Sequence, residues 1–104
     1  MDVVNAISKV RFASAKPQTV HLHKGTRLAA DLLCMEPGQR LEVSPAERIY
    51  YVVTGAATLS VHGTETPVPT GQLAATAADE PHGIANAGSQ RLVCVVIRTL
   101  SPGA

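Results

Sequence analysis

A chain of 104 residues is long enough to bury one hydrophobic core and too short for two, so we expect a single domain. Hydrophobic residues make up 45% of the chain and charged residues 16%, which is typical of a globular protein with well-buried elements. A net charge of +1 with two tyrosines, one phenylalanine and no tryptophan argues against nucleic-acid binding. No apolar run reaches the roughly 20 residues of a membrane span and no signal peptide is evident, so a cytoplasmic protein without membrane partners is expected.

The N-terminal residues 1–18 are expected to form an arm or a short helix that packs on the rest of the protein. Four apolar residues in this segment have a spacing compatible with a helix: Val3, Val4, Ile7 and Val10. Residues 19–100 should form the folded body, and the tail 101–104 is expected to be loose.

The body contains many short segments with the character of β-strands, separated by Gly and Pro turns: 19–23, 27–35, 49–53, 57–62, 66–68, 71–76, 83–85 and 91–99. Asp31 interrupts one face of segment 27–35, which suggests a partly solvated strand. Residues 92–97 are apolar and rich in β-branched side chains, as expected of a strand buried on both faces. With no convincing long helix, the pattern predicts an all-β sandwich or barrel with antiparallel strands.

Two stretches resemble the motifs of the cupin family. The first family motif is a glycine, then His-x-His, three or four residues, Glu, six residues and Gly. If Gly55 is the closing glycine, the family's metal-binding Glu falls on Arg48 and its two His fall on Glu42 and Ser44. In the second motif, Pro81-His82 and Asn86 match residue for residue. The resemblance narrows the fold to a single double-stranded β-helix, or jelly-roll, cupin barrel.

In cupins the ligands of both motifs converge inside the barrel, so the resemblance brings Glu42, Ser44, Arg48 and His82 together at its mouth. Tyr50 joins them because alternate residues of a strand share a face. A guanidinium stays protonated and has no lone pair, so Arg48 cannot bind a metal and would repel one. The first hypothesis is therefore a barrel without a cofactor, in which Arg48 pairs with Glu42 and the cavity binds a small polar or anionic molecule.

Two alternatives remain open. A one-residue adjustment at Pro45-Ala46 would turn Glu47 inward and Arg48 outward. Glu47, His82 and Glu42 could then hold a divalent transition metal, as in a dioxygenase or isomerase of the family. The other alternative is a structural or subunit-binding barrel without a ligand. The resemblance also implies a homodimer in each case.

Two further features allow competing interpretations. His21 and His23 could share one face of a strand and bind a metal, but a solvated polar face on an edge strand is the commoner explanation. Cys34 and Cys94 lie in apolar runs, where buried free thiols in a reducing compartment are favoured over a disulfide or a reactive thiol.

Overall fold

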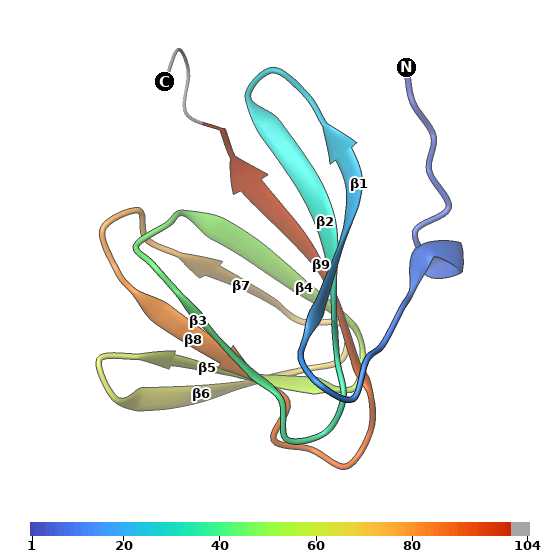
Figure 1. The fold of residues 1–104 in the computed structure, drawn as a ribbon. Helices are drawn as coiled ribbons and strands as arrows, with labels where there is room; N and C mark the ends of the chain where they lie inside the picture. Colours follow the sequence, from blue (N-terminus) through green and yellow to red (C-terminus); the bar gives the residue numbers. More distant parts are fainter. Residues whose placement is uncertain (101–104) are drawn as a thin grey trace.

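The computed structural model describes residues 1–100, which contain nine β-strands and one short 3-10 helix (Figure 1). The expected tail 101–104 lies outside the described residues. No helix within residues 1–100 is long and apolar enough to span a membrane. In chain order the elements are η1 (Ile7–Lys9), β1 (Gln18–Lys24), β2 (Leu28–Met35), β3 (Arg40–Val43), β4 (Arg48–Thr54), β5 (Ala56–Val61), β6 (Thr64–Pro69), β7 (Leu73–Thr76), β8 (His82–Ala85) and β9 (Leu92–Thr99).

The strands form two antiparallel sheets that face each other (Figure 1). One sheet has five strands in the order β1-β2-β9-β4-β7, and the other has four in the order β3-β8-β5-β6. Most neighbouring strands in space are not neighbours in sequence, because the chain crosses repeatedly from one sheet to the other. The all-β jelly-roll architecture expected from the sequence is confirmed.

The main hydrophobic core fills the space between the two sheets. Strand β4 shows how the sequence specifies it: Tyr50 is fully buried in this core, whereas the adjacent Tyr51 points away and is 43% exposed. The alternation predicted for this strand is therefore correct. The other members of the core come from both sheets: Leu33, Met35, Val52, Ala57, Leu59, Val68, Ile84, Leu92, Cys94 and Val96.

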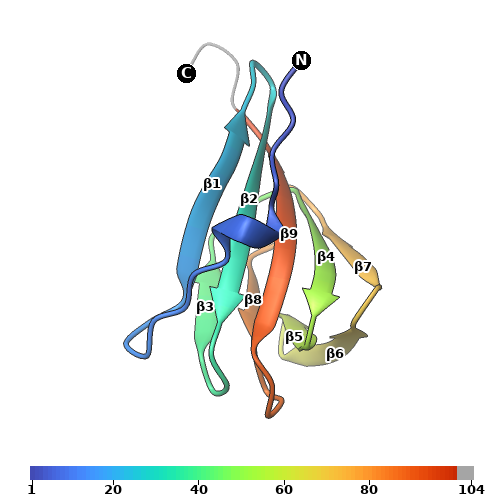
Figure 2. The ribbon, with the colours of Figure 1, turned by 90° about the vertical axis from the view of Figure 1, so that its right-hand side faces the viewer.

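A second, smaller core lies on the outer face of the five-stranded sheet, where the N-terminal segment crosses the strands (Figure 2). Ala6, Val10 and Phe12 pack there against a cluster that includes Leu32 and Cys34. Strand β2 is consequently buried on both faces, and even Asp31 on its inner face is only 4% exposed. The expectation that Asp31 marks a partly solvated strand is wrong, because charged partners described below hold the carboxylate inside the protein.

The N-terminal segment covers only part of this outer face. Strand β9 is buried from Leu92 to Cys94, but Val95, which packs at the margin of the outer core, and Ile97 are only half-buried. The prediction of a strand buried on both faces therefore holds for the first half of β9 and is wrong for the second half.

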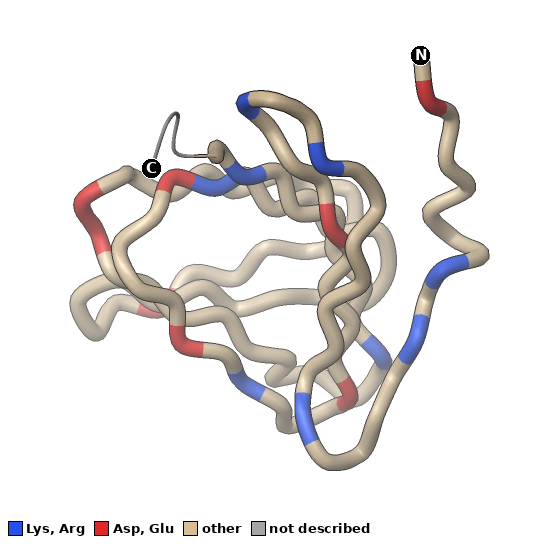
Figure 3. Tube along the Cα trace, turned by 45° about the horizontal axis from the view of Figure 1, so that its top comes forward, with Lys and Arg blue, Asp and Glu red and all other residues tan. Residues whose placement is uncertain are grey.

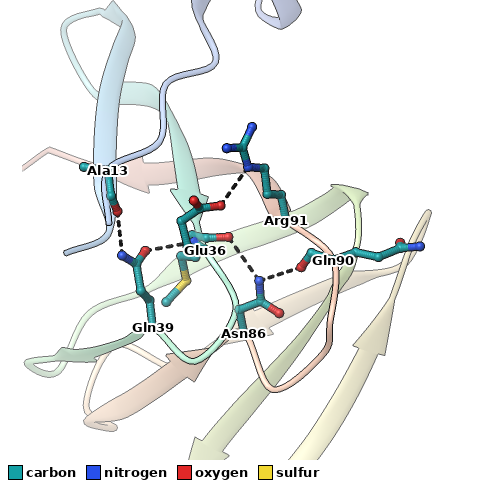
Figure 4. Close-up of polar contacts among 7 residues, drawn as sticks. Ala13, Glu36, Gln39, Asn86, Gln90 and Arg91 are labelled. Carbon is teal, nitrogen blue, oxygen red and sulfur yellow. Dashed lines mark hydrogen bonds and ion pairs between the residues drawn. The ribbon is translucent and has the colours of Figure 1, made fainter. Parts of the chain in front are cut away.

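A polar network closes the end of the barrel where β2 stops and β9 begins (Figure 4). The Asn86 amide donates hydrogen bonds to the carbonyl oxygens of Met35 (3.0 Å) and Gln90 (2.8 Å). The Gln39 amide donates to the Ala13 carbonyl at 2.7 Å and thereby ties the N-terminal segment to this end. Asn86, which matches the second cupin motif, thus stabilises the turns at this end of the barrel. The candidate site lies at the opposite end.

Candidate functional site

The end of the barrel opposite the Asn86 network is called the open end here. At this end, the inner face of the five-stranded sheet carries a pair of like charges. Arg48, the first residue of β4, lies directly opposite Arg98 of β9 in the antiparallel register. The start of β4 is held from the other side, because the Arg48 backbone N–H donates to Thr76 Oγ1 at 3.1 Å. Charged residues elsewhere lie mostly at strand ends and in connecting segments (Figure 3). Like charges directly opposite each other destabilise a sheet unless other groups compensate them.

Arg98 has its compensating partner in Asp31 of the neighbouring strand β2. Arg98 Nε donates to Asp31 Oδ2 at 2.8 Å, and the other carboxylate oxygen, Oδ1, lies 2.8 Å from Nδ1 of His21. Burial alone would raise the pKa of Asp31, but the hydrogen bonds and charges of Arg98 and His21 outweigh it and leave that pKa below its usual value. Both oxygens of this buried carboxylate are therefore occupied, and the charge of Arg98 is neutralised.

Arg48 has no such partner. It forms no ion pair with any carboxylate in residues 1–100, and its buried Nε has no hydrogen-bond partner there. The sequence suggested a pair with Glu42, but Glu42 Oε1 lies 2.6 Å from Nε of Arg40 instead. A half-buried guanidinium thus remains without a counter-ion at the open end of the barrel.

A cavity of about 520 Å³ opens beside Arg48, between the edge strands of the two sheets. Its wall mixes polar and apolar side chains from β1, β2, β3 and the β3–β4 connection: Thr19, Asp31, Leu41, Glu42, Val43, Ser44, Pro45, Ala46 and Arg48. Three of the five ligand-binding candidates, Glu42, Ser44 and Arg48, therefore line this cavity.

The other two candidates, Tyr50 and His82, form a buried pair deeper in the barrel. The Tyr50 hydroxyl lies 2.7 Å from Nε2 of His82, with the two rings edge to face at 77°. Tyr50 is fully buried and His82 is 3% exposed. The Nδ1 atom of His82 is also buried, and it has no hydrogen-bond partner of regular geometry within residues 1–100.

Burial favours the neutral forms of both side chains, and the charge of Arg48 affects the two in different ways. Burial raises the pKa of Tyr50, and the nearby Arg48 only partly offsets that effect. Burial also lowers the pKa of His82, and Arg48 lowers it further, against smaller opposing effects of Glu80 and Glu42. At neutral pH the Tyr50 hydroxyl and the His82 imidazole are therefore joined by a hydrogen bond between two uncharged groups.

Strand β3 meets the cavity in a different register from the one that the motif suggested. Leu41 packs against the main core and Val43 is buried, whereas Arg40 and Glu42 are exposed. The motif allows three or four residues between its second His and its Glu. Counting four places the two His positions on Leu41 and Val43, the residues that face inward. These two were missed, although the alternation of apolar and charged residues in 40–43 could have identified them.

The donors around the cavity do not suit the divalent metal that the resemblance implies. Leu41 and Val43 supply no donor, and the Nε2 atom of His82 already has the Tyr50 hydroxyl as its partner. Glu47, proposed from the sequence as an inward carboxylate, is exposed and lines a second hollow, whose wall also includes Arg48 and Arg98. Within residues 1–100 no group of three His, Cys, Asp or Glu side chains could hold a metal ion.

The remaining sequence candidates are placed apart from one another. A register shift in β1 separates His21, which binds Asp31, from His23, which lies 3.3 Å from Asp2. Both imidazoles are solvated on an edge strand, the commoner of the two interpretations. Cys34 belongs to the outer core and Cys94 to the inner one, and both thiols are free.

Comparisons with known proteins agree with this architecture. The crystal structure of TT1209 from Thermus thermophilus is 23% identical, with a TM-score of 0.88 over 98% of this chain and 100% of that one. An uncharacterized conserved protein with a double-stranded beta-helix domain from Klebsiella pneumoniae is 19% identical, with a TM-score of 0.85 over 95% of this chain and 90% of that one. An RmlC-like cupin protein from Desulfovibrio desulfuricans is 22% identical, with a TM-score of 0.79 over 94% of this chain and 96% of that one.

At these identities the likeness shows the fold and carries no statement about activity. No curated protein matches the sequence. The family model described as a cupin domain matches residues 31–98, which is well over half of the chain and contains β3 to β8 together with most of the cavity wall. The chain therefore belongs to the cupin family.

Proposed function

We propose that this protein binds a small anionic molecule at the open end of its barrel, with Arg48 as the charged contact. The observation that supports the proposal is the buried Nε of Arg48, which lacks a hydrogen-bond partner in residues 1–100. A buried donor without a partner costs about 1–3 kcal/mol, and more when the group is charged. A carboxylate or phosphate would satisfy the guanidinium through two parallel hydrogen bonds.

The surroundings of Arg48 favour a small molecule over a macromolecule. A cavity of about 520 Å³ falls within the range of roughly 300–1,000 Å³ that is common for small-molecule sites. In this proposal Arg48 and the Ser44 hydroxyl contact the ligand. The buried Tyr50–His82 pair lies on the side of Arg48 that faces the barrel interior and does not contact the ligand. Glu42 stays paired with Arg40 at the rim and makes no contact with the anion.

The test is calorimetric titration with benzoate, together with melting temperature, on protein first treated with a chelator. Wild-type protein should bind benzoate, and Arg48→Met should weaken binding at least about tenfold, because a charged hydrogen bond is lost. Arg11→Met is the matched control, since Arg11 is exposed on the N-terminal segment, away from the cavity. Equal affinity of wild type and Arg48→Met for benzoate would refute the proposal.

The oligomeric state and the cellular compartment are two further proposals. We propose a homodimer, which family membership suggests and which the mass measured by light scattering would test. We also propose a reducing, cytoplasmic compartment, because Cys34 and Cys94 are both free and buried. Cell fractionation would test that assignment.

A further inference from the structure

Asp31 limits the charge that the open end of the barrel can offer to a ligand. Arg48 and Arg98 are directly opposite each other in the register of β4 and β9, on the inner face of the sheet. Arg98 is bound by Asp31, whose second oxygen is taken by His21. Glu42 and Arg40 neutralise each other at the rim. One positive charge, that of Arg48, therefore remains for an incoming anion.

The cavity wall indicates what kind of molecule carries that anion. Leu41, Val43, Pro45 and Ala46 form an apolar side of the cavity, and the hydroxyls of Thr19 and Ser44 lie among the polar residues. An apolar body can pack against the first group while a carboxylate meets Arg48. A second negative charge on the ligand would find no free cation in the cavity wall, and it would lie near the Asp31 carboxylate.

We infer that the site selects small monocarboxylates with an apolar body, and that Asp31 sets this selectivity by neutralising Arg98. The inference rests on the proposed anion site and adds the class of ligand and a specificity-determining residue. Asp31 need not touch the ligand to act in this way. It acts by holding the second guanidinium in a buried ion pair.

Four probes separate charge from apolar contact in wild-type protein: acetate, benzoate, phthalate and inorganic phosphate, titrated at pH 8. Benzoate should bind about tenfold more tightly than acetate, because the ring buries apolar surface. Phthalate has the same ring with a second carboxylate, and it should bind about tenfold more weakly than benzoate, because that charge loses water without gaining a partner. Phosphate should also bind more weakly than benzoate, for the same reason.

The substitution Asp31→Asn frees Arg98 while keeping the size of the side chain. In this variant phthalate should bind at least as tightly as benzoate, a reversal of the wild-type order, because two guanidinium groups are then available. Glu42→Gln is the matched control: it also removes a carboxylate from the cavity wall, but one whose partner is Arg40. The order of the probes should stay unchanged in that control.

The outcomes distinguish the anion site itself from its selectivity for monocarboxylates. If wild-type protein binds none of the four probes, the anion site itself is refuted. If it binds them but phthalate or phosphate matches benzoate, the anion site stands and the monocarboxylate inference is overturned. The wild-type series separates these cases even if Asp31→Asn fails to fold, and an unreversed order in folded Asp31→Asn would remove the role of Asp31.

Discussion

The hydrogen bond between Tyr50 and His82 gives the sharpest prediction about stability. Tyr50→Phe removes one oxygen atom and leaves His82 Nε2 buried without its partner, which lies at 2.7 Å in the native protein. A buried polar atom that loses its hydrogen-bond partner costs about 1–3 kcal/mol. Since about 1 kcal/mol lowers the melting temperature of a domain of this size by roughly 4–8 °C, we expect a decrease of about 5–20 °C.

The neighbouring tyrosine provides the matched control. Tyr51→Phe makes the same chemical change at a residue that is 43% exposed and points away from the core, so its effect should stay within about 0.5 kcal/mol. Thermal and urea denaturation followed by circular dichroism measure both variants. Equal stability of Tyr50→Phe and Tyr51→Phe would show that the hydroxyl of Tyr50 makes no important bond.

A double substitution distinguishes a lost bond from a general disturbance of packing. In Tyr50→Phe/His82→Leu both polar partners are absent, so no buried polar atom is left without its partner. The double variant should therefore be more stable than the sum of the two single effects predicts, by about 1 kcal/mol or more. Strict additivity would contradict the direct contact.

Three further predictions concern pH, a turn and the thiols. Burial lowers the pKa of His82 in the folded protein, so as the pH decreases the imidazole is protonated in the unfolded chain before it is protonated in the folded one. Stability should therefore fall as the pH decreases below about 6.5. Denaturation at several pH values should show a weaker decrease in His82→Leu. Gly55→Ala should lower the free energy of unfolding, measured by urea denaturation, by more than Gly63→Ala does. Both glycines have φ = 78°, so the backbone strain is the same. An added Cβ at Gly55 would lie 2.5 Å from the Arg91 carbonyl oxygen, whereas one at Gly63 would meet open space. Burial raises the pKa of Cys94 to about 12, so a thiol reagent should modify it only on unfolding; rapid modification of the folded protein would contradict its burial.

Much of the architecture follows from local patterns in the sequence. The alternation in 48–52 correctly predicts that Tyr50 faces the core and Tyr51 faces outward, because a strand has a strict two-residue period. The β-branched run 92–97 is likewise a central strand, between β2 and β4. The incomplete burial of Val95 and Ile97 in β9 could not be predicted, because it depends on how far the outer core extends across the sheet.

The candidate site was harder to predict, because it depends on register and on pairing between distant strands. A one-residue ambiguity in the motif moves its two His positions from Glu42 and Ser44 to Leu41 and Val43, the residues on the inner face. The side chains that bind the Asp31 carboxylate come from β1 and β9, which are far apart in sequence. An acidic residue inside an apolar strand is a useful signal, but a sequence does not show whether water or a buried cation satisfies it.

The central claim is that Arg48 binds an anion at the open end of the barrel, and NMR of its side chain tests this most directly. Benzoate would be titrated into ¹⁵N-labelled protein while the Nε–H resonances of the arginines are recorded, with Arg48→Met and Arg11→Met used to assign the signals. The account predicts a saturable shift of the Arg48 Nε–H resonance and an unchanged Arg11 resonance, because the buried Nε of Arg48 gains the partner that it lacks. An Arg48 resonance that does not respond while benzoate binds elsewhere would contradict it.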